Sequence, residues 1–138
     1  MDTRHVPTLE LSQEFDRLCK EKGIVVPQTE FYWCGGEKEG YIVRANNDCP
    51  QYQGVIYFPA PLVSELGEWL PSYLHPLFLG AVKSTTKDGI VWLVRYFPTS
   101  RIEDYKYEFI AETEADARLQ MLNYLIAEGK ITTLCQPT

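Results

Sequence analysis

The chain has 138 residues, of which 45% are hydrophobic and 23% are charged, an ordinary composition for one globular domain with its own core. A net charge of -6 and a pI near 4.9, without a cluster of Lys and Arg, exclude a surface built for duplex DNA. No apolar run approaches the ~20 residues of a membrane-spanning helix, and the N-terminal segment lacks the apolar stretch of a signal peptide. We therefore expect a single cytoplasmic domain over residues 1–138, without membrane contact and with residues 1–7 frayed.

The first half of the chain predicts one helix followed by three strands. Thr8 is of a residue type that begins helices, and Gly23 is well placed to end this one in a left-handed conformation. Between them, one apolar stripe recurs at helical spacing: Leu11, Phe15 and Leu18. The three predicted strands are residues 30–34, 41–45 and 54–58. The first two are expected to form a hairpin through a turn that opens at Gly35 and Gly36.

The second half predicts a short helix, three strands and a long final helix. The short helix is expected over residues 62–70, closed by Pro71, with residues 72–76 irregular. The three predicted strands are residues 77–84, with Gly80 as a candidate bulge, 90–97 and 105–110. Thr113 begins the final helix and Gly129 ends it, and its core-facing stripe includes Leu119, Leu122 and Ile126. Residues 131–134 form either a short strand or a segment packed into the core.

The resulting order α-β-β-β-α-β-β-β-α predicts an α+β fold. Because tight turns join many of the strands, we expect one mostly antiparallel sheet of five to six strands, packed with three helices. Alternation would point Ile90, Trp92, Val94 and Tyr96 into the core.

Strand 90–97 is apolar on its other face as well, apart from Arg95. An apolar strand of this kind is normally covered on both sides. If all three helices instead lie on one side of the sheet, the other face becomes a candidate partner surface made of Val91, Leu93 and Phe97. Its simplest occupant is a second copy in a two-fold homodimer.

The four cysteines show no CxxC spacing that would indicate a metal or redox motif: Cys19, Cys34, Cys49 and Cys135. We expect them to be reduced in a cytoplasmic protein and to act as small buried residues. Cys34 lies beside the Gly35 turn, but no basic neighbour in the sequence would lower its pKa.

Residues suited to catalysis are few. The two histidines, His5 and His75, lie in the N-terminal segment and in a loop, and no HExxH, GxSxG, P-loop or GxGxxG motif is present. Two acidic sets resemble acid–base groups: Glu65 with Glu68, and Glu112 with Glu114 and Asp116. The first set would lie on the solvent-exposed face of the short helix. The second would lie at the N-terminus of the final helix, where the helix dipole favours negative charge. We therefore expect no catalytic residue, cofactor or metal ligand, although a carboxylate-only magnesium site stays open.

Exposed aromatic side chains on a sheet would also suit single-stranded nucleic acid, if basic side chains lay beside them. The basic residues in the aromatic strands are few: Arg44, Arg95 and Lys106. Core packing of the rings is the stronger interpretation.

Three segments carry a resemblance: EFYW at residues 30–33, PAPLVSELGEWLP at 59–71 and FIAETEADARLQMLNYLI at 109–126. Together they resemble a family of small uncharacterised proteins of bacteriophages and bacterial mobile elements. The resemblance covers most of the chain in the same order, and its two helical segments are the most specific part. It implies an accessory protein of a phage or integrated element, and no catalytic residues to carry over.

Two hypotheses about function follow. The first is a non-enzymatic phage or mobile-element accessory protein that acts by binding another protein. The alternative is a small enzyme with a carboxylate-based site, with or without magnesium. A flat apolar patch would favour the first hypothesis, and a deep pocket with a bound ligand would favour the second.

The charge distribution predicts that the protein does not bind duplex DNA at physiological salt. Without clustered cations, few counterions would be released from DNA on binding. A gel-shift titration should therefore show no retarded band. Micromolar binding that weakens steeply with added salt would contradict this expectation.

Overall fold

The computed structural model describes residues 5–36, 40–49, 55–98 and 104–134. The helices are α1 (Leu9–Lys22), α2 (Val63–Trp69) and α3 (Glu114–Ala127). The strands are β1 (Phe31–Gly36), β2 (Gly40–Ala45), β3 (Ile56–Pro59), β4 (Tyr73–Leu74), β5 (Leu77–Thr86), β6 (Gly89–Phe97) and β7 (Tyr107–Ala111). A single 3-10 turn, η1 (Asn46–Asp48), follows β2.

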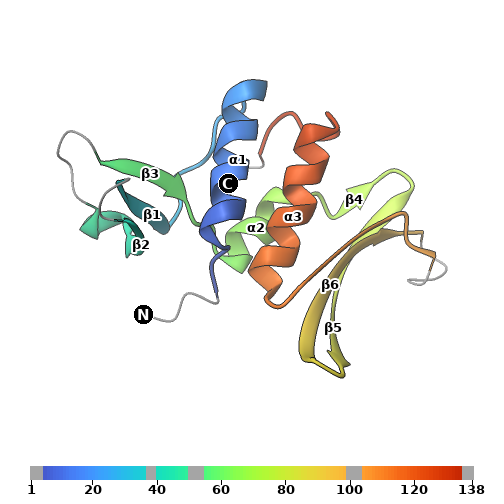
Figure 1. Ribbon diagram of the computed structural model, residues 1–138. Helices are drawn as coiled ribbons and strands as arrows, with labels where there is room; N and C mark the ends of the chain where they lie inside the picture. The colour runs from blue at the N-terminus through green and yellow to red at the C-terminus, as the bar shows by residue number, and fades with distance from the viewer. Residues whose placement is uncertain (1–4, 37–39, 50–54, 99–103, 135–138) are drawn as a thin grey trace.

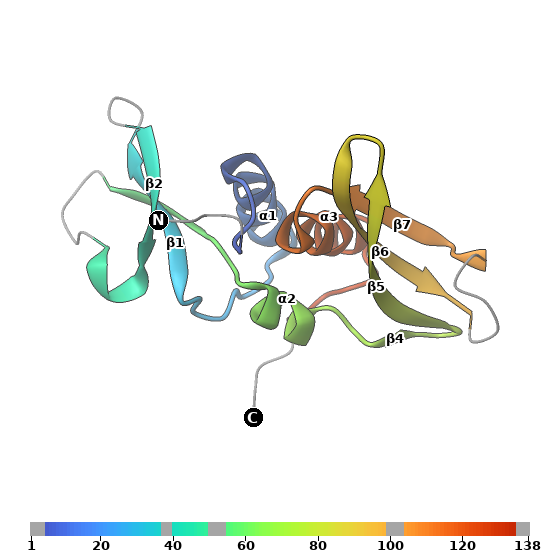
Figure 2. The ribbon, with the colours of Figure 1, turned by 90° about the horizontal axis from the view of Figure 1, so that it is seen from below.

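The α+β class and the antiparallel pairing are confirmed, but the expectation of one sheet of five to six strands is wrong. The described strands form two antiparallel sheets, with strand orders β2-β1-β3 and β4-β5-β6-β7. The pair α1 and α3 lies between these sheets, with the first sheet beside α1 and the second beside α3 (Figures 1 and 2). Helix α2, flanked by Pro61 and Pro71, carries the chain from β3 to β4, so these strands do not pair.

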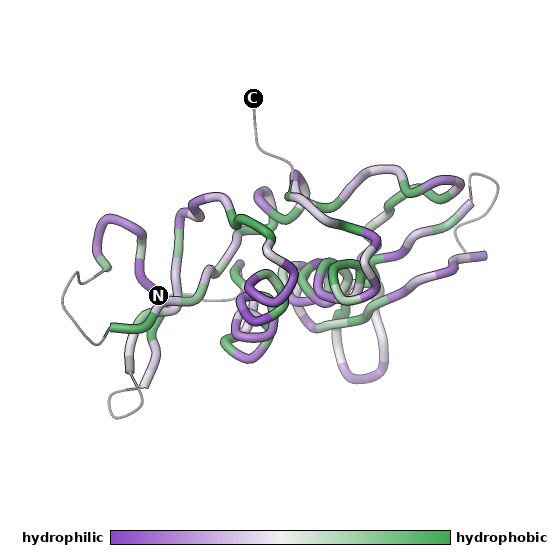
Figure 3. Tube along the Cα trace, turned by 90° about the horizontal axis from the view of Figure 1, so that it is seen from above, coloured by the Kyte–Doolittle hydropathy of each residue, from purple (hydrophilic) through white to green (hydrophobic). Residues whose placement is uncertain are grey.

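The predicted ends of the two long helices are confirmed. Gly23 follows α1 with a left-handed φ of 69°, and Gly129 follows α3 with a φ of 73°. The Thr113 side chain accepts a hydrogen bond from the Asp116 backbone N–H at 3.2 Å, which caps α3. Hydrophilic and hydrophobic stretches alternate along both helices (Figure 3). Only α1 keeps a face of exposed residues, because eight of the 14 residues of α3 are buried and only Ala127 of this helix is exposed.

The main core lies between α3, its neighbouring helices and the inner face of the second sheet. Phe15 of α1 stacks on Trp69 of α2, with ring centroids 5.8 Å apart. Val94 and Tyr96 of β6 are fully buried, as predicted, and the Tyr96 hydroxyl donates to the Pro71 carbonyl at 2.7 Å. The prediction is wrong for Ile90 of the same face, which is 51% exposed beside the β5–β6 turn, and Trp92 is only partly buried. The predicted stripe of α3 is also fully buried: Leu119, Leu122 and Ile126.

A smaller apolar cluster joins the N-terminal segment to the first sheet. Val6 is buried against Val43 and Ala60, and the Trp33 indole donates to the Pro7 carbonyl at 3.0 Å. The expectation that residues 1–7 fray therefore does not hold for Val6 and Pro7. Residues 1–4 lie outside the described ranges.

Three local predictions need correction or completion. Gly80 is no bulge, because it keeps regular register opposite Arg95. Residues 72–76, expected to be irregular, contain the two-residue strand β4. Residues 131–134 pack into the core through Ile131 and Leu134 rather than adding a strand.

In the described ranges the longest helices, α1 and α3, have 14 residues each, and no helix combines the length and apolar character that crossing a membrane requires.

Truncation of α3 should weaken the whole fold. Leu122 is fully buried in the main core, so Leu122→Ala should lower the free energy of unfolding by about 2–5 kcal/mol, because it leaves a cavity. Urea denaturation would measure the change. Val25→Ala is the control, since this side chain is 78% exposed and its loss should cost less than about 0.5 kcal/mol. Equal stability of the two variants would contradict the packing described here.

Candidate functional site

The second sheet packs only one of its faces against the helices. Helix α3 contacts β6 and β7 on the face that carries Val94 and Tyr96. The opposite face points away from α1, α2 and α3 (Figure 2). Its apolar members, which we call the outer face, are Tyr73, Phe78, Val82, Val91, Leu93, Phe97 and Ile110.

Strand register makes the outer face continuous across all four strands. Leu93 of β6 lies between Val82 of β5 and Ile110 of β7, so these three side chains form one row. Phe97 lies opposite Phe78, whose ring contacts Tyr73 at a centroid distance of 4.9 Å. Together these pairs give an apolar surface that runs from β4 to β7.

The outer face also collects side chains that would normally be buried. The described residues include nine exposed large hydrophobic side chains, and four of them belong to this face. Those four are Tyr73 at 46%, Phe78 at 38%, Val82 at 37% and Ile110 at 51% exposed. A concentration of this kind on one sheet face is typical of an interaction surface.

Gly80 shapes the middle of the outer face. The Phe97 ring lies over Gly80, and a Cβ at that position would stand 2.6 Å from the ring. Only a residue without a side chain lets the Phe97 ring lie this close to β5. The absence of a Cβ thus serves aromatic packing instead of the predicted bulge.

Charge on the outer face is neutralised locally. Arg95 forms an ion pair with Glu108 of the adjacent strand, and both side chains are largely buried. The Arg95 guanidinium also lies 4.4 Å from the centre of the Tyr105 ring. Arg95 is therefore already engaged, which weakens the single-stranded nucleic acid interpretation.

Most members of the two predicted acidic sets have structural partners. The Glu65 carboxylate accepts from the backbone N–H groups of Leu62, at 2.8 Å, and Glu30, at 3.2 Å. Glu114 forms an ion pair with Arg118 at 2.7 Å. Glu68 is an exposed residue of α2. These contacts hold helix ends in place.

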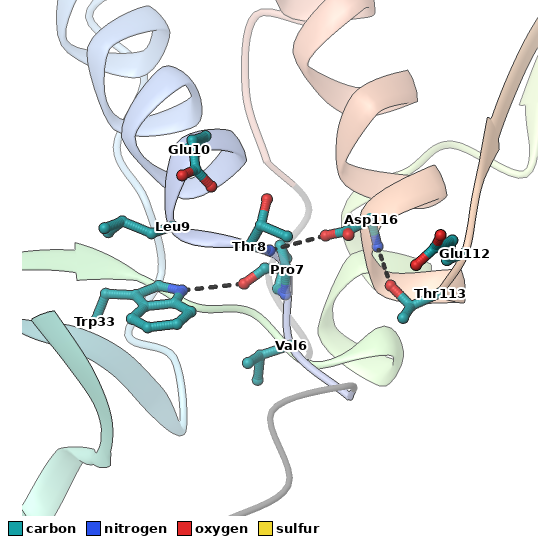
Figure 4. Close-up of a pocket in the computed structure, with 9 residues that line it drawn as sticks. All are labelled: Val6, Pro7, Thr8, Leu9, Glu10, Trp33, Glu112, Thr113 and Asp116. Atoms are coloured by element: carbon teal, nitrogen blue, oxygen red, sulfur yellow. Dashed lines mark hydrogen bonds between the residues drawn. The ribbon is translucent and has the colours of Figure 1, made fainter.

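The remaining acidic residues line a cleft between the N-terminal ends of α1 and α3 (Figure 4). The cleft has a volume of about 450 Å³. Its wall consists of Val6, Pro7, Thr8, Leu9, Glu10, Trp33, Glu112, Thr113 and Asp116. The Asp116 carboxylate accepts a hydrogen bond from the Thr8 backbone N–H at 2.8 Å. The polar groups at the centre of the cleft therefore join α1 to α3.

Burial raises the pKa of Asp116 above its ordinary value, although the hydrogen bonds from Thr8 and with Thr113 act in the opposite direction. Within the ranges that the structure describes, no three His, Cys, Asp or Glu side chains come close enough to hold a metal ion.

Of the two histidines, His5 lines a second concave surface together with Glu112 and Glu114, whereas His75 lies elsewhere. His75 Nδ1 shares a hydrogen bond of 2.7 Å with the Tyr73 hydroxyl at an exposed position. The His5 ring packs edge-on against Phe31. Neither contact forms the base–carboxylate arrangement that general acid–base catalysis uses.

The cysteines are distributed unequally. Cys19 is buried in the main core, whereas Cys34 and Cys49 meet beside the first sheet, with their Sγ atoms 2.7 Å apart. Cys135 lies outside the described residues. The meeting of Cys34 and Cys49 could not be predicted from their spacing, because a complete hairpin strand separates them.

With this geometry established, comparison of the chain with known protein families, curated proteins and solved structures finds no match.

The buried carboxyl group of Asp116 predicts a specific pH dependence. Because its pKa is raised in the folded state, the stability it contributes is present at low pH and is lost as the pH rises from about 3.9 through the raised pKa. Asp116→Asn does not ionise and keeps an oxygen that can accept from Thr8. Urea unfolding at several pH values should therefore show the variant gaining stability relative to wild type as the pH rises.

Asp116→Ala is the control for this experiment. It removes the acceptor for Thr8 and should be less stable than the Asn variant at every pH. Parallel pH profiles for wild type and Asp116→Asn would show that burial does not perturb this group.

Proposed function

We propose that this chain is a non-enzymatic protein that acts by binding another protein through the outer face of the second sheet. The single observation that carries the proposal is the continuous apolar surface over β4, β5, β6 and β7, on the face turned away from the helices (Figure 2). Covering this surface would stabilise a complex by roughly 25 cal/mol for each Å² of apolar area removed from water.

The form of the outer face restricts what can occupy it. Within the part of the chain that the structure describes, the centre of the face presents no unpaired charge, because Arg95 and Glu108 neutralise each other. A partner selected by charge would find no counterpart there. The occupant should be an apolar and similarly flat surface, and the outer face of a second copy meets both requirements. The simplest proposal is therefore a two-fold homodimer.

The biological setting is also a proposal. The segments at residues 59–71 and 109–126 support an accessory protein of a phage or bacterial mobile element, through the family resemblance alone. In the fold these segments form α2 and α3 with their flanking residues. Their pattern is thus also accounted for by packing, as with the buried Leu66 and Leu70.

A small enzyme with a carboxylate-based site is the second candidate. The cleft between α1 and α3 favours it, because Glu10, Glu112 and Asp116 line one concave surface. Against it stands the hydrogen bond between Asp116 and Thr8, which engages one of these carboxylates in joining the helices. The outer face is the better supported site.

A charge placed in the central row tests the homodimer. Leu93→Asp should convert a dimer into a folded monomer, because an unpaired carboxylate would be buried in the interface. Size-exclusion chromatography with light scattering measures the mass, and circular dichroism checks folding. Ile110→Asp provides a second variant whose side chain is already 51% exposed, so its monomer fold should be unaffected.

Val25→Asp is the matched control, because this residue lies in the segment after α1 and should leave the dimer intact. A wild-type protein that stays monomeric at high concentration would contradict the homodimer. So would an equal effect of the Val25 and Ile110 variants.

A further inference from the structure

Two cysteines that are far apart in the sequence come into contact on the first sheet. Cys34 lies in β1, the central strand, and Cys49 directly follows η1. Both side chains are buried, and their Sγ atoms are 2.7 Å apart. A disulfide has an S–S distance of about 2.05 Å, so bond formation would need only a small approach of the two sulfurs.

The local fold explains why these two residues meet. Cys34 pairs with Ile42 of β2 and Tyr57 of β3, and it points to the face opposite Trp33, whose side chain packs on the helical side. The η1 turn then reverses the chain after β2. The Cys49 backbone N–H donates to the Asn46 carbonyl at 3.4 Å, which places Cys49 over Cys34.

We propose that Cys34 and Cys49 are a redox-active pair that forms a reversible intramolecular disulfide by exchange with a low-molecular-weight disulfide. This inference is independent of the proposed protein-binding function, because the pair lies on the first sheet and the outer face on the second.

A small cavity shows which sulfur reacts first. It has a volume of about 200 Å³ and is lined by Tyr32, Asn46, Cys49 and Tyr57. Cys49 lines this cavity, and Cys34 is not among the described residues that line it. Burial, together with the hydrogen bond to Cys49, raises the pKa of Cys34 to about 12. Because Cys49 lines the cavity through which a small disulfide can approach, Cys49 is the attacking sulfur, and Cys34 is the sulfur that completes the exchange.

The reaction balances in two exchange steps. The Cys49 thiolate attacks one sulfur of the small disulfide, whose S–S bond breaks, and one small thiol leaves after taking up a proton. Cys34 then loses its proton and attacks the Cys49 sulfur of the mixed disulfide, which expels the second small thiol. The two cysteines together lose two electrons and two protons, and the small disulfide is reduced to two thiols.

The contact between the sulfurs favours the second step over escape of the mixed disulfide. A nucleophile held in contact reacts as if it were present at very high concentration, which offsets the scarcity of the Cys34 thiolate. The product would connect the central strand to the segment after η1, and it would restrict the unfolded chain between these residues. Oxidation should therefore raise the melting temperature, and reduction should return it to its starting value.

The experiment uses the full chain in a Cys135→Ser background, which leaves Cys19, Cys34 and Cys49. The protein is incubated with glutathione disulfide, both folded and during refolding, and then examined by intact mass and peptide mapping. We expect the loss of two hydrogen atoms, one peptide pair linking Cys34 to Cys49, and reversal by dithiothreitol. Cys19, buried in the main core, should stay reduced and serves as the internal control.

Single variants test the order of the steps. Cys34→Ser should accumulate a stable glutathione adduct on Cys49, and Cys49→Ser should form neither the adduct nor the disulfide in the folded state. Circular dichroism verifies that both variants fold. Absence of the Cys34–Cys49 link in both the folded and the refolded protein would overturn the proposal, as would a link to Cys19. An adduct on Cys34 in the Cys49 variant would overturn the assigned order.

Discussion

The burial of helix α3 on almost every side is the constraint on which the rest of the structure depends. Eight of its residues are buried, and α1, α2 and the second sheet all pack against it. Among them is Asn123, whose amide donates to the Leu11 carbonyl at 3.3 Å and so joins α3 to α1. A helix buried on most of its sides organises a core and leaves little of its own surface exposed.

This arrangement explains why the second sheet keeps an open face. Helix α1 lies beside the first sheet and α3 beside the second, so the helices of the described ranges cover each sheet on one side only. Among the described residues, Leu93 and Phe97 of β6 then have no helix to pack against, although they are as apolar as the buried Val94. A strand that is apolar on both faces is thus covered on both sides in one fold and leaves an exposed apolar face in another.

Several polar side chains that could serve chemistry are instead engaged in contacts that hold the fold together. Asp116 and Thr8 join the starts of α3 and α1, Arg95 and Glu108 neutralise each other, and Glu65 accepts backbone hydrogen bonds. Carboxylates of this kind can resemble acid–base sets in the sequence, but in the fold they make structural hydrogen bonds and ion pairs. The sulfur atoms of Cys34 and Cys49 differ, because their contact creates a chemical possibility that neither has alone.

The sequence by itself determined the local elements, because helix caps, apolar periodicity and turn residues act over a few positions. Thr113, Gly129 and the stripe through Leu122 were sufficient for α3, and alternation alone placed Val91, Leu93 and Phe97 on one face. Only the tertiary structure decided the division into two sheets and the contact between Cys34 and Cys49. It also decided which apolar side chains share the outer face with Leu93, namely Phe78, Val82 and Ile110. Each of these depends on contacts between residues distant in sequence, and such contacts follow from strand pairing and helix packing, which local patterns do not encode.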